Sequence, residues 1–249
     1  MSLVAFFASV TLFLVLRPSA LRAQDEPCMK EVRAVLEQVG HTLEEQDALW
    51  GELQITTVSA DRTRPSVEKL QQGSGNDRLV TENDHFTLFQ DQEHRVLVMH
   101  LDKEVFIYDQ PKGIPPPSFE RWANGNERVF QVAQLSVCRK VHGSGADRIE
   151  ATLQLPTDDV SGMQEVTYAV DPALQRLISL HIRYRKGQPH RSRTILYRSL
   201  VPGRLDSRLE RSALANVLTS GKPRAEFAQH TINDLRDKAP RKQPSSHVD

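Results

Sequence analysis

Short runs in which apolar and polar residues alternate recur along this chain from about residue 53 to residue 200. The runs occupy residues 53–57, 86–89, 96–101, 105–108, 129–138, 149–155, 166–170, 178–184 and 194–200. Side chains of a strand point alternately to two faces, so a period of two is typical of half-buried β-strands. Polar turns such as 91–93, 158–159 and 186–189 separate the runs. We therefore predict an antiparallel meander of about ten strands, which excludes a doubly wound α/β fold.

A different period precedes the strands. Apolar residues recur every three or four positions from Met29 to Leu43, with charged and amide side chains between them. This spacing predicts an amphipathic helix. Pro27 lies near its start, where a missing N–H costs little.

The pattern of apolar faces constrains how the sheet is covered. Residues 148–155 separate cleanly into an apolar and a polar face, whereas residues 93–101 are apolar on both. A strand with one solvated face and a strand covered on both faces fit one curved sheet that is partly covered on its concave side. The predicted class is mainly β (α+β), with a leading helix.

Two segments interrupt the strand pattern. Residues 111–126 contain three consecutive prolines, which exclude a central strand and leave a lid, a crossing loop or a short helix from Ser118. Residues 206–236 show helical spacing at Leu205, Leu209, Ala213 and Val217, followed by a short strand near 231–235.

The N-terminus fixes the compartment. Residues 3–16 are small or apolar, and a possible cleavage site follows at Ala23. Fourteen residues fall short of the roughly 20 that span a bilayer, so the segment predicts an export signal rather than an anchor. We expect a signal peptide at 1–23, one β domain over 24–236 and a disordered tail over 237–249. The mature protein is then periplasmic or secreted and is not an integral membrane protein.

Charge and cysteine content limit the partners. The chain has 32 basic and 32 acidic residues, interspersed along its length. The sequence has no stripe of basic residues of the kind that binds nucleic acid, so we predict no nucleic-acid partner. Cys28 and Cys138 are the two cysteines of the chain. In an exported protein they could form a disulfide, or they could be separate buried thiols.

Catalytic signatures are weak. Gly143-Ser144-Gly145 lacks the Gly-x-Ser-x-Gly spacing of a nucleophile elbow. The nine histidines show no metal-binding spacing, and His94 and His100 would lie ~20 Å apart on a continuous strand. Carboxylate pairs can meet in three dimensions without a sequence signature, so an exported hydrolase acting on envelope polymers is the alternative function. We predict no cofactor and no metal.

Several segments together resemble a known family. They are Trp50-Gly-Glu-Leu-Gln-Ile-Thr-Thr, Phe86-Thr-Leu-Phe-Gln-Asp, Arg95-Val-Leu-Val-Met, Glu104-Val-Phe-Ile-Tyr-Asp, Gln164-Glu-Val-Thr-Tyr-Ala-Val-Asp-Pro and Leu177-Ile-Ser-Leu-His-Ile-Arg-Tyr. Following a signal peptide and a helix, this order is similar to the lipoprotein-carrier (LolA-like) group of exported bacterial proteins. The resemblance covers residues 28–200 and implies an unclosed half-barrel. In that fold, helices lie on the concave side and a cavity receives acyl chains.

The predicted function is therefore a non-enzymatic carrier or binding protein for an apolar ligand, such as a lipid or the acyl chains of envelope lipoproteins. The candidate lining residues lie on the predicted strand faces and are Leu88, Val96, Val98, Ile107, Leu153, Val166, Ile178 and Leu180. A solid core would use the same residues, so a structural or interaction protein is a further alternative.

Overall fold

The computed structural model describes residues 27–45, 48–111, 119–142, 147–158 and 161–236. The predicted signal peptide, the predicted tail and nearly all of the Pro-rich segment 111–117 therefore lie outside the described residues. Within these ranges, twelve strands form one sheet with the order β14-β6-β5-β4-β3-β2-β1-β11-β10-β9-β8-β7.

The strands of this sheet are β1 (Ala48–Ser59), β2 (Ser66–Gly75), β3 (Arg78–Glu82), β4 (Phe86–Gln90), β5 (His94–Met99), β6 (Glu104–Asp109), β7 (Gln134–Val141), β8 (Arg148–Gln154), β9 (Met163–Asp171), β10 (Arg176–Tyr184), β11 (His190–Pro202) and β14 (Thr231–Asp234).

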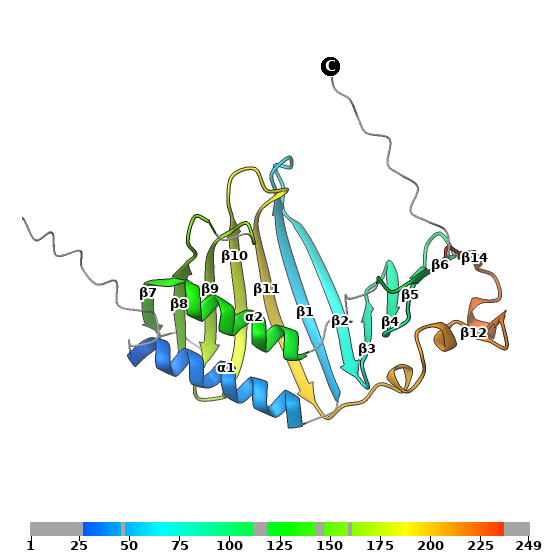
Figure 1. Ribbon diagram of the computed structural model, residues 1–249, viewed down its shortest axis with the longest axis horizontal. Helices are drawn as coiled ribbons and strands as arrows, with labels where there is room; N and C mark the ends of the chain where they lie inside the picture. The colour runs from blue at the N-terminus through cyan, green and yellow to red at the C-terminus, as the bar shows by residue number, and fades with distance from the viewer. Residues whose placement is uncertain (1–26, 46–47, 112–118, 143–146, 159–160, 237–249) are drawn as a thin grey trace, which may run out of the picture.

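Two antiparallel meanders, β1–β6 and β7–β11, make up the sheet, and the β1–β11 pair joins them. Helix α2 (Phe119–Val132) carries the chain from β6 to β7, the far end of the sheet (Figure 1). The sheet is not closed, because β7 and β14 are its two ends. This architecture confirms the predicted half-barrel. Strand β14 pairs with β6 in parallel and is the exception to the antiparallel order in the described sheet.

The N-terminal helix is confirmed as α1 (Pro27–Glu45). Its apolar stripe, including Met29, Val32 and Val35, is buried against β7–β10. Helix α2 confirms the helix alternative for the 111–126 interruption and corrects the strand predicted from Val129. Val129 and Phe130 are buried on the last turns of α2, and β7 begins only at Gln134. Packing on the sheet decided the structure of a run whose apolar residues fit either period.

The helix predicted from the spacing of Leu205–Val217 is wrong. Residues 207–210 and 214–216 form two single 3₁₀ turns instead, followed by the β12–β13 hairpin (Leu218–Thr219, Lys222–Pro223) and a third turn at 225–227. Leu209, Ala213 and Val217 are nevertheless buried, because the segment presents them to the sheet. The short strand expected near 231–235 is present as β14.

The two hydrophobic cores lie on opposite faces of the sheet. The first packs α1 and α2 against residues such as Leu153, Val166 and Tyr168; we call this side the helix face. The second core packs residues 209–217 against Val96, Val98 and Ile107. Cross-strand pairs share a face, and the row Trp50, Gly73, Val80, Phe89, Val96 and Ile107 is opposite to the helix face. We call this side the far face.

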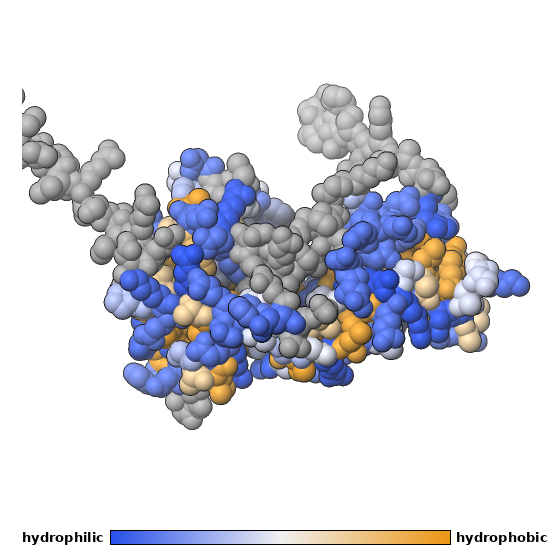
Figure 2. Space-filling view, turned by 60° about the horizontal axis from the view of Figure 1, so that its bottom comes forward, coloured by the Kyte–Doolittle hydropathy of each residue, from blue (hydrophilic) through white to orange (hydrophobic). Residues whose placement is uncertain are grey.

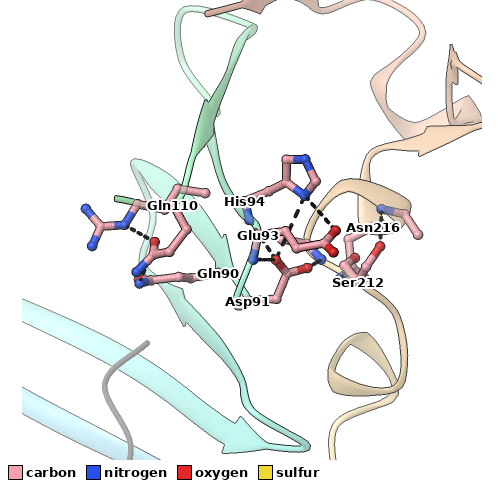
Figure 3. A network of polar contacts seen from close by, with 10 residues as sticks. Gln90, Asp91, Glu93, His94, Gln110, Ser212 and Asn216 are labelled. Carbon is pink, nitrogen blue, oxygen red and sulfur yellow. Dashed lines mark hydrogen bonds and ion pairs between the residues drawn. The ribbon is translucent and has the colours of Figure 1, made fainter. Parts of the chain in front are cut away.

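Segment 205–236 is fixed to the far face by polar contacts as well as by its core. Asp91 accepts hydrogen bonds from the backbone N–H groups of Glu93 and His94 in its own turn and from that of Ala213 (Figure 3). Arg208 pairs with Glu82 and Asp206. The C-terminal segment is thus an integral part of the second core.

A disulfide joins Cys28, in the first turn of α1, to Cys138 in the outermost strand β7, with a Cα–Cα distance of 6.1 Å. Cys138 pairs with Ala151, which is fully buried in the first core. The bridge therefore fastens the start of α1 to the β7 end of the helix face.

Candidate ligand surface

The helix face carries an apolar surface that continues beyond the two helices. The register aligns Tyr168 of the first core with Leu180, Ile195 and Ile55 in one cross-strand row. A second row runs from Thr81 through Leu88 and Leu97 to Phe106. The apolar side chains of this face on the strands from β11 to β6 form what we call the apolar band. They are Leu53, Ile55, Leu70, Leu88, Leu97, Phe106, Ile195 and Tyr197.

All eight band residues are partly exposed, whereas the core residues under α1 and α2 are buried. Figure 1 shows both helices in front of β7–β11, with β2–β6 at the other end of the sheet. Hydrophobic surface (orange) is visible in both halves of the molecule in Figure 2. The band residues lie on two groups of three strands, β11–β1–β2 and β4–β6, and β3 between them contributes Thr81 to this face. Partly exposed apolar side chains on neighbouring strands are typical of a surface that binds an apolar partner.

The eight lining residues predicted from the sequence do not lie together. Leu88 belongs to the apolar band. Leu180 pairs with Ile195 of the band, at the position where the band meets the first core. The others are placed as follows: Val96, Val98 and Ile107 are fully buried in the far-face core, Leu153 and Val166 are buried under the helices, and Ile178 occupies a bulge of β10.

Sequence reasoning missed most of the band. Leu97 and Phe106 lie on strands that are apolar on both faces, and the choice of Val96 and Ile107 instead placed this part of the predicted lining on the opposite side of the sheet. Leu70 lies on β2, a strand with weak alternation. Leu70 can be recognised as a band residue only from its pairing with Leu53, which is visible once the strand register is known.

The first core also contains a polar contact between sheet and helix. The Tyr168 hydroxyl donates a hydrogen bond to the side-chain oxygen of Asn126 on α2 at 2.9 Å. Burial raises the pKa of Tyr168 well above its usual range. This phenol therefore stays neutral at pH 7 and joins α2 to β9 through its hydrogen bond.

A pocket lies where β1, β2, β3 and β11 come together, and its lining includes Leu53 and Leu70 of the apolar band. It has a volume of about 590 Å³, and charged and amide side chains line it, among them Glu52, Gln71, Glu82 and Arg198. Most of its lining is polar, which does not suit an acyl chain. Among the residues that the structure describes, no group of three or more His, Cys, Asp and Glu side chains could hold a metal ion. No helix in the described ranges is long and apolar enough to cross a membrane.

Comparisons with known proteins give no matching family model and no matching curated protein. The solved structures to which the chain is similar include the following three. An uncharacterized conserved protein from Thermus thermophilus is 9% identical, with a TM-score of 0.45 over 82% of this chain and 98% of that one. Lipoprotein LppX from Mycobacterium tuberculosis is 10% identical, with a TM-score of 0.40 over 66% and 93%.

The third is a domain from Vibrio parahaemolyticus that is named for outer membrane lipoprotein sorting. It is 12% identical, with a TM-score of 0.29 over 67% of this chain and 91% of that one.

Proposed function

We propose that this protein is an exported, non-enzymatic binding protein that holds an apolar ligand, such as an acyl chain, against the apolar band. The observation that carries the proposal is the continuity of the helix face. Its buried core under α1 and α2 passes without a polar break in the Tyr168–Leu180–Ile195–Ile55 row into partly exposed side chains.

Burial of an acyl chain on this surface can supply enough free energy for binding. Burying a methylene group contributes about 0.8 kcal/mol, so a chain of 14–16 carbons could supply on the order of 10 kcal/mol before the costs of association. The band crosses strands that lie about 4.8 Å apart, and six strands contribute to it. An extended acyl chain therefore has apolar contacts on each of these six strands, with Thr81 of β3 as the polar position between the two groups.

The test is binding of a neutral fluorescent apolar probe, N-phenyl-1-naphthylamine, to the mature protein. We expect Leu97→Gln to weaken binding by about tenfold or more, since it removes one leucine contact of about 1.5–3 kcal/mol. Val67→Gln is the matched control, because Val67 is 56% exposed and pairs with Thr56 on the far face. Equal binding by both variants, or no binding by the wild type, would overturn the proposal.

A second measurement uses the natural ligand. Protein purified from the exported fraction of its own host is analysed by native mass spectrometry and lipid extraction. Co-purified lipid supports the proposal. Val98 is one of the lining residues predicted from the sequence, but Val98→Asp is unsuitable as a test of binding. Val98 is fully buried in the far-face core, and an aspartate there would unfold that core.

A further inference from the structure

The helix face ends in a polar corner at the Ser59 end of β1 and the His190 end of β11. Arg193 pairs with Ile182 and with Thr57, and Ile182 in turn pairs with Val166 of the first core. Arg193 therefore points to the helix face. His190 pairs with Ser59, and a bulge at Arg191 makes His190 the next residue after Arg193 on that face.

Both side chains have a buried nitrogen without a hydrogen-bond partner among the described residues. These atoms are Nε of Arg193 and Nδ1 of His190. No ion pair of the described chain involves Arg193. A partly buried guanidinium is expected to be paired with an anion, because an unpaired buried donor is costly. Two such groups close together indicate an anion that the described residues do not supply.

The surroundings of this corner are basic. The loop 60–65 contacts the β10–β11 hairpin, since the Ala60 N–H donates to the carbonyl of Pro189 and Arg191 donates to the carbonyl of Ala60. These two loops contribute Arg62, Arg64 and Lys186, all exposed, against the single acid Asp61. Their positive potential favours an approaching anion.

The corner lies directly next to the apolar band. Arg193 is two residues before Ile195 on β11, so their side chains are about 6–7 Å apart along the same face. A head group at Arg193 would thus place the first carbons of its chain on Ile195 and on its cross-strand partner Ile55.

We propose that Arg193 and His190 bind the carboxylate or phosphate head group of an anionic amphiphile whose chain lies along the apolar band. This inference rests on the proposed function and specifies its ligand class. Arg193 donates from its guanidinium to the anion, and His190 donates from Nδ1 in the tautomer that carries the proton there. A neutral lipid would leave both groups unpaired.

The experiment measures displacement of N-phenyl-1-naphthylamine by hexadecanoate, hexadecyl phosphate and hexadecanol, which share one chain and differ in the head group. We expect both anions to displace the probe at least tenfold more effectively than the alcohol. Arg193→Gln should make displacement of the probe by the two anions at least tenfold less effective and should leave displacement by the alcohol unchanged. The ratio of the two anions identifies which head group fits the corner.

Arg183→Gln is the matched control, because Arg183 lies on β10 beside this corner but pairs with Glu165 on the far face. If Arg193→Gln does not fold, as judged by circular dichroism, His190→Gln provides the same comparison. Equal displacement by all three compounds, with no effect of either variant, would overturn this inference and leave the proposed function intact. Binding of none of them and of no probe would overturn the proposed function.

Discussion

The side chain of Asp91 accepts a hydrogen bond at 2.6 Å from the backbone N–H of Ala213, a residue 122 positions further along the chain. Asp91 is 8% exposed, and its other oxygen accepts the N–H groups of Glu93 and His94 at 2.9 and 2.7 Å. One carboxylate therefore shapes the β4–β5 turn and anchors the C-terminal segment over the far-face core.

Asp91→Asn should lower the free energy of unfolding by about 1–3 kcal/mol, since an amide cannot present two acceptor oxygens and one buried N–H loses its partner. Urea unfolding measures the change. Asp84→Asn is the control, because Asp84 lies in the turn between β3 and β4 and its substitution should change stability by less than about 0.5 kcal/mol. Equal stability of both variants would contradict this role.

The Cys28–Cys138 bridge closes a loop with a sequence separation of 110 residues. Its reduction, or the double substitution Cys28→Ser/Cys138→Ser, should lower the free energy of unfolding by up to about 4–5 kcal/mol. Denaturant midpoints with and without dithiothreitol measure this, and thiol titration of the unreduced, denatured protein should find no free thiol. Two free thiols would refute the bridge.

Gly73 lies beneath the ring of Trp50, where an added Cβ would meet ring carbons at 2.5 and 2.6 Å. Gly73→Ala should therefore destabilise the protein by about 1–3 kcal/mol through overpacking. Gly40→Ala is the matched control on α1, where no atom lies within 4 Å of the added methyl group. That substitution should instead stabilise the helix by up to about 1 kcal/mol. Chemical denaturation of both variants measures whether the free energy of unfolding falls for Gly73→Ala and rises for Gly40→Ala.

Stability should also fall in acid because of Asp206. Hydrogen bonds from Arg208 hold the pKa of Asp206 below its usual value of 3.8. The unfolded chain thus binds a proton more readily than the folded one. The contribution of Asp206 is present above about pH 3.8 and is lost as the pH falls through the lower pKa of the folded state. Arg208→Gln should flatten this decline in urea unfolding measured between about pH 5 and pH 2.5. A decline as steep as that of the wild type would exclude the pair as its cause.

Local patterns predicted most of the fold, and tertiary packing explains the exceptions. Alternation identified strands such as β8, because one of its faces is solvated. It missed β2, since Gly73 and its neighbours resemble a turn until Trp50 covers them. The spacing of Leu209, Ala213 and Val217 indicated correctly that these residues are buried but not that a segment of 3₁₀ turns buries them.

The candidate site was less predictable than the fold. A strand that is apolar on both faces, such as β5, does not reveal which face meets which core. That choice depends on register across the strands from Ile195 to Phe106. Arg193 and His190 have no motif. Their signal is the lack of a partner for a buried nitrogen, which becomes visible only after the chain has folded.

The seam between the two meanders has a consequence for folding kinetics. Every other antiparallel pair of the large sheet joins strands that are consecutive in the chain, whereas β1 must find β11, so that Gly51 meets Leu200. Closing so long a loop is entropically costly and slow. Each meander can form early from local contacts, so we expect the pairing of β1 with β11 to be the slow step of folding. Ile55 and Ile195 pair at this seam and also belong to the apolar band, so the contact that we expect to form last lies within the proposed ligand surface.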